Sequence, residues 1–437
     1  MLRVLYTLLV HLSLPLLPLR LWWRGRREPL YRAHLGERYG RYSPAGPVRG
    51  PVLWVHAVSL GETRASVPLV ERLLRAYPDA TLLLTCMTAT GRAAGESLFG
   101  PRVTQAWLPY DAPFAVRAFL AHWKPAAGLI METELWPNLV AAAREAGVPL
   151  YLVNARLSER SAAGYARVES IARPMLAALA GVAAQAEPDA RRLAALGAPA
   201  PRVTGNLKFD LDAPADAPER AAALRAWLGA SRPVFVAAST RDGEEALLLD
   251  ALAAHPLPDR ALTVVVPRHP QRFDAVAQLL AARGLGFARR SRGTPVPPAA
   301  DVVLGDSMGE LFAYYAAADV AFVGGSLLPF GGQNLIEAIA AGCPTLVGPH
   351  MFNFADATRN AIAAGAALEV ADPVALVATV RALLADPGRR QAMRDAASAF
   401  HAAHRGAADR LWEWLAPQLD AAVRDARAAA ANRAAGG

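Results

Sequence analysis

Residues 51–76, PVLWVHAVSLGETRASVPLVERLLRA, contain the pattern that decides the fold. Pro51–His56 is a short apolar run typical of a buried strand, and Thr63–Ala76 has apolar residues at helical spacing. The same alternation continues toward residue 204. Further strands are predicted at Thr81–Met87, Val103–Leu108, Gly128–Met131, Pro149–Asn154, Gly181–Ala184 and Arg202–Thr204. Near-continuous apolar strands that alternate with helices predict a parallel sheet buried on both faces.

A second series follows a stretch rich in Ala, Pro, Asp and Arg at 210–232. Its predicted strands are Val234–Ala238, Leu262–Val266, Asp301–Leu304, Val320–Val323 and Pro344–Val347. Helices are predicted at Asp372–Leu384, Gly388–His404 and Ala407–Leu415, and the Ala/Arg-rich tail after them is expected to fray. Because 437 residues exceed one ordinary core, this second series is expected to form a second domain.

The predicted fold class is α/β, with two doubly wound, Rossmann-like parallel-sheet domains facing across a cleft. The predicted boundaries are an anchor at 1–27, an N-terminal domain at 28–210, a linker at 211–232 and a C-terminal domain at 233–437. Ligands of such sheets bind at the carboxyl ends of the strands. Polar residues directly after a strand are therefore the first candidates for function.

The N-terminal segment is predicted to associate with a membrane. Val4–Leu19 is strongly apolar, and its length is about the minimum for a bilayer span. Trp22 and Trp23 follow beside several arginines, a combination that suits the headgroup region. No small-residue cleavage site follows, which disfavours a signal peptide. Arginines after the apolar run place residues 24 onward in the cytoplasm, and both a spanning anchor and a helix lying in the membrane remain open.

Composition narrows the function classes. The net charge of +8 favours an anionic partner, although an arginine-rich chain with only two lysines also fits a coding bias. Cys86 and Cys343 have no ligand-like spacing. Motifs for dinucleotide binding, P-loop binding and a paired-carboxylate metal clamp are absent from the sequence. No interleaving of aromatic and basic residues suggests a nucleic-acid module.

Three candidates follow strands of the first series. Glu62 has no basic residue three or four positions later, so it has no ion-pair partner along its own helix. It is either a functional carboxylate or a first-turn residue favoured by the helix dipole. Glu132 and Glu134 either bind a ligand or pair with arginines while Thr133 caps a helix. Lys208 is a retained lysine in an arginine-rich chain, which indicates either a required ammonium or an exposed linker residue.

The second series holds cationic and glycine-rich candidates. Arg268 and His269 follow a strand and suit a phosphate, with a surface ion pair as the alternative. Ser307 and Glu310 have the spacing of a helix capping box. The glycine pairs in 324–332 are expected to present N–H groups to a phosphate, with Glu337 accepting from ribose hydroxyls.

Taken together, the motifs WVHAVSLGE, METELWPN, NARLS, GNLKFD, VPRHPQRF, DSMGEL and GGQNLIEA resemble those of the 3-deoxy-D-manno-octulosonic acid (Kdo) transferase family. The resemblance extends from the anchor to about residue 410 and implies a GT-B glycosyltransferase fold. It also implies a CMP-Kdo donor, no cofactor and no metal. The implied acceptor is a phosphorylated lipid A precursor, lipid IVA, with the catalytic domains on the cytoplasmic side of the inner membrane and no nucleic-acid partner.

The resemblance implies a role for each matching residue. Glu62 would be the general base of an inverting transfer. The nucleotide site would comprise Arg268, His269, Met308, Gly309, Glu310, Asn334, Leu335, Ile336 and Glu337. Further candidate contacts to the two substrates are Ser59, Glu132, Lys208, Gly325 and Ser326. The chain departs from the family pattern at Ala57, Gln333 and Leu335, where serine, histidine and proline are expected.

Two other functions are compatible with parts of the pattern. One is a GT-B-like transferase or epimerase that uses another nucleotide sugar, and inhibition by CMP but not UDP would argue against it. The other is a non-catalytic, membrane-bound protein that binds lipid through its basic surface. That protein would show no turnover of the nucleotide sugar and little effect of changing Glu62.

Overall fold

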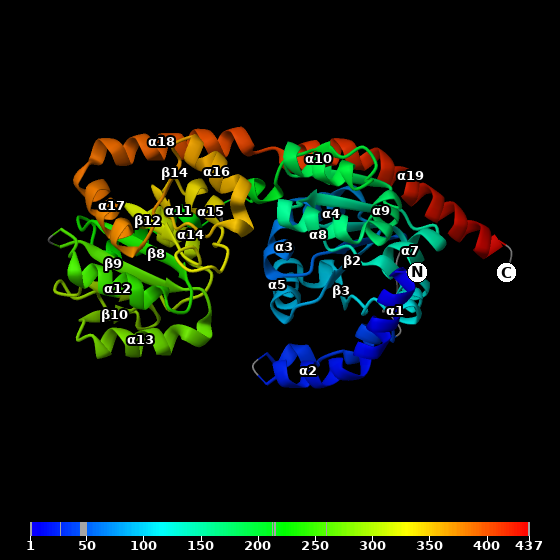
Figure 1. Cartoon of the computed structure of the whole chain (residues 1–437), viewed down its shortest axis with the longest axis horizontal. Coiled ribbons are helices and arrows are strands. Elements are labelled where there is room, and N and C mark those ends of the chain that lie inside the picture. Colours follow the sequence, from blue (N-terminus) through cyan, green and yellow to red (C-terminus); the bar gives the residue numbers. More distant parts are fainter. Residues whose placement is uncertain are drawn as a thin grey trace. The chain divides into compact units, whose positions relative to one another are not determined.

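The computed structural model describes residues 2–26, 28–43, 50–211, 213, 216–258 and 260–435, and the chain is shown in Figure 1. It divides into two compact units. Unit 1 comprises Met1–Leu211 with Arg405–Gly437, and unit 2 comprises Asp212–His404. The prediction of one C-terminal domain at 233–437 was therefore wrong, because the last part of the chain belongs to unit 1.

Unit 1 is built on a parallel sheet with the strand order β3-β2-β1-β4-β5-β6-β7. Its strands are β1 (Val52–His56), β2 (Thr81–Cys86), β3 (Thr104–Trp107), β4 (Pro125–Met131), β5 (Leu150–Ala155), β6 (Gly181–Ala184) and β7 (Arg202–Val203). Every residue of β1 is buried, which explains its continuous apolar sequence. These strands confirm the predicted series.

Helices cover both faces of this sheet (Figure 1). They include α3 (Leu60–Ala65), α4 (Val67–Ala76), α5 (Ala89–Phe99), α6 (Pro113–Trp123), α7 (Pro137–Glu145), α8 (Glu159–Arg167), α9 (Glu169–Ala177) and α10 (Glu187–Ala195). The single helix predicted at Thr63–Ala76 is in fact two helices. Pro68 lies in the first turn of α4, where its missing N–H costs nothing, so the chain restarts a helix there.

The C-terminal helix α19 (Ala407–Ala435) completes the core of unit 1. Leu411, Leu415 and Leu419 recur every fourth residue, are fully buried and pack in the same cluster as Leu53 and Val55 of β1. The predicted fraying after residue 415 was wrong, because the alanine-rich sequence has high helix propensity and continues the helix.

Unit 2 has a second parallel sheet with the order β10-β11-β9-β8-β12-β13-β14. Its strands are β8 (Val234–Thr240), β9 (Leu262–Pro267), β10 (Phe287–Arg289), β11 (Val302–Leu304), β12 (Val320–Val323), β13 (Thr345–Val347) and β14 (Ala367–Glu369). The two edge strands, β10 and β14, were not predicted. Strands β11 and β13 are equally short, but all their residues are buried, whereas β10 and β14 include a charged residue and partly exposed positions, so no apolar run marks them in the sequence.

The helices of unit 2 include α11 (Ala217–Leu228), α12 (Glu244–Ala254), α13 (Phe273–Ala282), α14 (Leu311–Ala317), α15 (Leu335–Ala340), α16 (Ala355–Ala363), α17 (Pro373–Ala385) and α18 (Pro387–His404). Helix α11 occupies much of the predicted linker at 211–232. Its Leu224 and Leu228 are buried, so this stretch is part of unit 2 rather than a linker.

Both sheets are doubly wound, as predicted. The strand order reverses between β1 and β4 in unit 1 and between β8 and β12 in unit 2. Loops that leave neighbouring strands in opposite directions open a crevice at such a reversal, and ligands bind there. The candidate residues after β1, β4, β9 and β12 lie at these carboxyl edges.

The N-terminal segment forms α1 (Leu2–Ser13), a 3₁₀ turn (Leu14–Leu16) that contains Pro15, and α2 (Leu17–Arg24). The stretch Leu2–Arg24 is long and apolar enough to cross a membrane. The polar side chains of α1 contact the body of unit 1. Tyr6 Oη donates to Asp111 Oδ2 at 2.9 Å, and Thr7 Oγ1 donates to Asn138 Oδ1 at 3.1 Å.

Candidate functional site

Glu62 lies at the carboxyl end of β1, in the first turn of α3. Ser59 is the N-cap, and its Oγ accepts from Glu62 N at 3.4 Å and donates to Glu62 Oε1 at 2.8 Å. The other carboxylate oxygen, Oε2, accepts from Val58 N at 2.8 Å. This arrangement is close to a capping box, so the structural interpretation of Glu62 holds. It also fixes the carboxylate in one position, which a catalytic group requires.

The electrostatic surroundings of Glu62 are unusual for a capping residue. Burial, reinforced by the charge of Glu132, raises the pKa of Glu62 to about 7, although the bonds from Val58 and Ser59 act in the opposite direction. Its side chain is only 8% exposed. A carboxyl group with such a pKa exchanges its proton near neutral pH.

Glu132, at the end of β4, forms an ion pair with Lys208. Lys208 Nζ lies 2.8 Å from Glu132 Oε1, and the two side chains are 14% and 18% exposed. Burial raises the pKa of Glu132, but the ammonium of Lys208 and the charge of Arg156 outweigh it and hold that pKa below its usual value. Lys208 is therefore not an exposed linker residue, and the interpretation that an ammonium is needed here fits the structure.

Backbone strain accompanies this pair. Glu132 and Asn154 have φ of 56° and 52°, which non-glycine residues adopt at a cost of about 1–3 kcal/mol each. Asn154 Oδ1 accepts from Leu207 N at 3.0 Å, which holds the short 3₁₀ helix Leu207–Asp210 that carries Lys208. Both residues with positive φ thus contact the segment around Lys208, Glu132 through its side chain and Asn154 through the bond to Leu207.

Two expectations for the loop after β4 can be corrected. Thr133 does not cap a helix, because its Oγ1 donates to the carbonyl of Arg156 and the N-cap of α7 is Trp136. Glu134 is not paired with an arginine through any interaction found among the described residues. Burial, followed by the charge of Glu132, raises the pKa of Glu134.

In unit 2, Arg268 and His269 follow β9 as predicted. Arg268 Nε donates to Gln333 Oε1 at 3.0 Å, which links the end of β9 to the loop before α15. Burial lowers the pKa of His269, and the nearby charges of Arg241, Arg268 and Arg272 lower it further. The carboxyl edge of unit 2 thus gathers positive charge, which suits an anionic ligand.

The glycine-rich loop after β12 differs from the expectation. Gly325 N and Ser326 N donate to the carboxylate of Glu244, at 2.6 and 2.9 Å, and Leu327 N donates to it at 2.9 Å. The prediction that these N–H groups receive a phosphate was wrong. Glycine is needed because a Cβ on Gly324 would lie 2.7 Å from Thr240 Cα. The glycine allows two strand ends to approach closely.

The second glycine pair also supports the loop rather than opening an anion site. Gly332 N donates to Gly325 O at 2.7 Å. Asn334 caps α15 by accepting from Ile336 N at 3.2 Å. Leu335 and Ile336 have buried side chains, so only their backbone could contact a nucleotide, while Glu337 is partly exposed in the first turn.

The predicted nucleotide contacts at 308–310 form a loop between β11 and α14. Met308 is 58% exposed and Gly309 has φ of +78°. The capping box of Ser307 and Glu310 was wrong, because α14 begins only at Leu311. Glu310 instead pairs with Arg290, whose Nη2 lies 2.7 Å from Oε1, and this bond lowers the pKa of Glu310.

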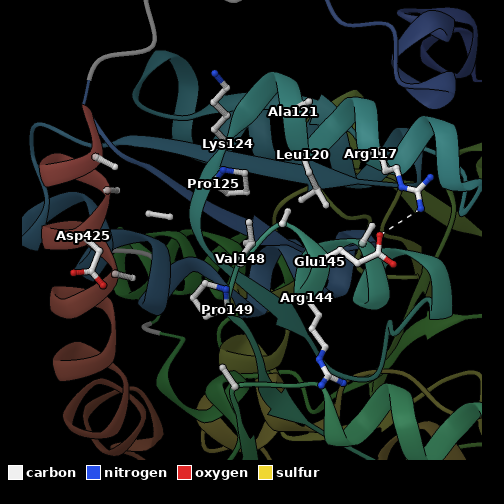
Figure 2. A pocket seen from close by; sticks show the side chains of 18 of the residues that line it. Arg117, Leu120, Ala121, Lys124, Pro125, Arg144, Glu145, Val148, Pro149 and Asp425 are labelled. Carbon is white, nitrogen blue, oxygen red and sulfur yellow. Dashed lines mark hydrogen bonds and ion pairs between the residues drawn. The ribbon is translucent and has the colours of Figure 1, made fainter. Parts of the chain in front are cut away.

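Figure 2 shows a cavity of unit 1 whose lining includes none of these candidate residues. It has a volume of about 1010 Å³ and is lined by Lys124, Pro125, Pro149 and Arg144, among others. Pro125 begins β4 and Pro149 precedes β5, so the cavity lies at the amino end of the sheet. This end is not where doubly wound sheets bind substrates, and cavity size is no guide to the site here.

Sequence reasoning missed two residues of unit 2, Arg241 and Glu244. Both follow Thr240, the last residue of β8, so the rule that favoured polar residues after a strand applied to them as well. Among the described residues, no group of three or more His, Cys, Asp or Glu side chains could hold a metal ion.

Comparisons with known proteins give consistent results. Residues 33–211 match the family model "3-Deoxy-D-manno-octulosonic-acid transferase (kdotransferase)", and residues 294–400 match "Glycosyl transferases group 1". The chain is 51% identical to 3-deoxy-D-manno-octulosonic acid transferase of Bordetella pertussis, covering 94% of this chain and 99% of that protein. It is 36% identical to the enzyme of the same name from Haemophilus influenzae, covering 96% and 99%.

A solved structure with a similar fold is UDP-GlcNAc 2-epimerase from Neisseria meningitidis. It superposes with a TM-score of 0.58 and 15% identity, covering 84% of this chain and 100% of that chain. At this identity the likeness shows the fold alone, two parallel-sheet α/β domains of GT-B type.

Proposed function

Because the chain belongs to the 3-deoxy-D-manno-octulosonic acid transferase family, we propose that it transfers Kdo from CMP-Kdo to lipid IVA with Glu62 as the general base. Membership of the family makes the chain a Kdo transferase of lipopolysaccharide biosynthesis. The nucleotide sugar, the acceptor and the catalytic base are proposed.

The observation that carries the proposal is the state of Glu62. Among the described residues, its carboxylate is bonded only to Val58 N and the Ser59 hydroxyl, and no cation pairs with it. With a pKa of about 7 it can accept a proton from a sugar hydroxyl near neutral pH. A carboxylate held by a salt bridge would be a weaker base, because a nearby cation lowers its pKa.

The transfer balances with these groups. The acceptor hydroxyl oxygen forms a bond to the anomeric carbon of Kdo while its proton passes to Glu62. The bond from that carbon to the phosphate oxygen breaks, and CMP leaves with the electron pair. Arg268 supplies positive charge for the departing phosphate. His269 is neutral near pH 7, because burial and the neighbouring arginines lower its pKa, and it offers the phosphate a hydrogen bond. One base on the face opposite the leaving group gives inversion.

The N-terminal helices support a membrane-bound acceptor. Tyr6 and Thr7 hold α1 against Asp111 and Asn138, whereas Leu8, Leu9 and Leu12 of the same helix are more than half exposed. A spanning helix would draw Asp111 and Asn138 into hydrocarbon, which is costly. We therefore propose that α1 and α2 lie in the membrane plane.

The tryptophans and arginines of α2 and the turn after it also fit a helix that lies in the membrane plane. Trp22 and Trp23 are 50% and 62% exposed, and Arg26 stacks on Trp22 at 4.3 Å. Tryptophan beside arginine is typical of the headgroup region, where arginine attracts anionic lipid. The arginines after the apolar run favour the anionic cytoplasmic leaflet of the inner membrane, and so the cytoplasmic side for the catalytic units.

The test uses the purified full chain with CMP-Kdo and lipid IVA, and the product is identified by mass spectrometry. The wild type should add the mass of Kdo, and Glu62→Gln should lose transfer by at least 100-fold while CMP binding stays within about twofold. A matched control is Glu169→Gln, which removes an exposed carboxylate of unit 1 and should leave transfer unchanged. Normal turnover by Glu62→Gln would refute the base.

Competition distinguishes the nucleotide sugar. CMP should inhibit transfer and UDP should not. Inhibition by UDP alone would favour a transferase or epimerase that uses a UDP-sugar. A chain without turnover of any nucleotide sugar would favour the non-catalytic lipid-binding protein.

A further inference from the structure

The segment after β8 contains charged groups that the proposed mechanism does not use. Glu244 is 1% exposed, and its carboxylate accepts from Arg241 N at 2.8 Å as well as from the N–H groups of Gly325, Ser326 and Leu327. A concave set of N–H groups would normally bind an anionic ligand. Here the carboxylate of Glu244 already accepts from these N–H groups, so side chains must bind a substrate anion at this strand end.

Arg241 is the side chain best placed for that role. Its Cζ lies 4.7 Å from the ring centroid of Phe330, and its Cγ lies 3.4 Å from the position of a Cβ on Gly325. In the part of the chain that the structure describes, no carboxylate pairs with its guanidinium. Its neighbour Arg272 contrasts with it, because Asp242 and Glu245 both pair with that residue.

Arg241 and Arg268 both approach the loop that contains Gly325 and Gln333. Gln333 Oε1 accepts from Arg268 Nε at 3.0 Å, and Gln333 Nε2 lies 3.1 Å from the Cβ position of Gly325 that Arg241 also approaches. A nucleotide sugar such as CMP-Kdo has two anionic groups, the phosphodiester and the carboxylate of the sugar acid. Two guanidinium groups beside one loop match these two charges.

We propose that Arg241 binds the carboxylate of the donor sugar and so selects an acidic sugar. This inference rests on the proposed function, because it takes CMP-Kdo as the nucleotide sugar. A planar guanidinium matches a carboxylate with two parallel hydrogen bonds, and contact with the Phe330 ring restricts its orientation.

The position of Glu244 favours Arg241 as the partner of the sugar carboxylate and Arg268 as the partner of the phosphate. Its buried negative charge contacts the backbone of Arg241. The charge on the phosphate grows as CMP departs, and a carboxylate behind Arg241 would oppose that growth. The charge of the sugar carboxylate does not change during transfer. Arg241 therefore suits the carboxylate, and Arg268 suits the phosphate.

The experiment compares two ligands that differ by the sugar acid. The KM for CMP-Kdo and the inhibition constant for CMP are measured for the full chain with Arg241→Gln, Arg241→Lys and Arg268→Gln. Arg241→Gln should raise the KM for CMP-Kdo by about 10- to 100-fold and change CMP inhibition by less than about twofold. Arg241→Lys keeps the positive charge but loses the two parallel N–H donors of the guanidinium, and should raise that KM by about 3- to 10-fold. Arg268→Gln should weaken both ligands.

A matched control is Arg283→Gln, which breaks only an exposed pair with Asp250 and should change neither constant. Equal weakening of CMP and CMP-Kdo by Arg241→Gln would overturn the proposal, because Arg241 would then bind the nucleotide. An unchanged KM in a folded Arg241→Gln would overturn it as well. If the wild type itself neither used CMP-Kdo nor bound CMP, the proposed function would fail before this inference was reached.

Discussion

Glu62 combines an observed structural role with the proposed role of general base. Its hydrogen bonds come from Val58 and Ser59, within four residues along the chain, so the loop and helix start fix its position. Burial and the charge of Glu132 determine its proton affinity. The position of Glu62 is thus a local property, and its pKa depends on the fold.

The first prediction concerns the pH dependence of transfer. Because only the ionised form of Glu62 accepts a proton, kcat/KM should rise with pH, reach half its maximum near pH 7, and fall about tenfold for each pH unit below. Initial rates measured from about pH 5.5 to about pH 8.5, a range that brackets this pKa, check the predicted profile. A flat profile across that range would contradict the base assignment.

Two variants test the cause of the raised pKa. Glu132→Gln removes the neighbouring negative charge, so the pKa of Glu62 should fall and the profile should move to lower pH. Lys208→Met removes the cation that pairs with Glu132 and should move the profile to higher pH. Shifts in the same direction for both variants would show that the charge of Glu132 is not the cause.

At the residue scale, the sequence indicated where the candidate side chains lie better than it indicated their contacts. Glu132 and Arg268 were predicted because each directly follows an apolar strand, and Glu62 because it lies where a strand is joined to its helix. The sequence could not show that Glu244 occupies the N–H groups of Gly325 and Ser326, because a glycine pair looks the same whether its partner is a phosphate or a carboxylate from another segment.

At the scale of single elements, α1 is the clearest example of a property that only the structure provides. Its apolar length fits a spanning helix and an in-plane helix equally well. The hydrogen bonds of Tyr6 and Thr7 join α1 to Asp111 and Asn138, 105 and 131 positions away, and these contacts are the basis of the proposed in-plane helix.

The second prediction tests the in-plane helix. Leu2→Cys should be labelled by a membrane-impermeant maleimide in inside-out vesicles and not in intact spheroplasts, because an in-plane helix keeps both ends on one side. The native Cys86 and Cys343 are buried and should give little background. Leu247→Cys, on α12 of unit 2, serves as the control for the side of the catalytic units. Labelling of Leu2→Cys from the opposite side to Leu247→Cys would show a spanning helix.

Strands and helices of the interior were predictable to within a few residues, whereas edges and breaks were not. The apolar runs of β1 and β8 are continuous because helices cover both faces of each sheet. Strands β10 and β14 lie at the edges of their sheet, with three residues each, and their sequences carry no period that distinguishes them from loops.

At the scale of the whole molecule, the chain leaves unit 1 after Leu211 and returns to it at Arg405. The sequence predicted the amphipathic pattern of the last helix but not the sheet that it covers, because an apolar stripe does not specify its partner. Helix α19 supplies Leu411, Leu415, Leu419 and Val423 to the core of unit 1. Unit 1 therefore depends on both ends of the chain, whereas unit 2 is one continuous segment.

The last prediction follows from this division. Leu415→Ala empties a fully buried position of unit 1 and should lower the free energy of unfolding of that unit by about 2–5 kcal/mol. Leu383→Ala does the same in unit 2, where Leu383 is fully buried in the core.

The unfolding transitions of the two units are told apart by adding CMP. CMP binds and stabilises unit 2 if the proposed site is correct, so it identifies that unit's transition. Hydrogen exchange or limited proteolysis during urea unfolding assigns each transition to its residues. Leu415→Ala should lower the transition that CMP does not protect, and Leu383→Ala the one that it does. If Leu415→Ala instead weakened the CMP-protected unit, α19 would be part of unit 2, as the sequence first indicated.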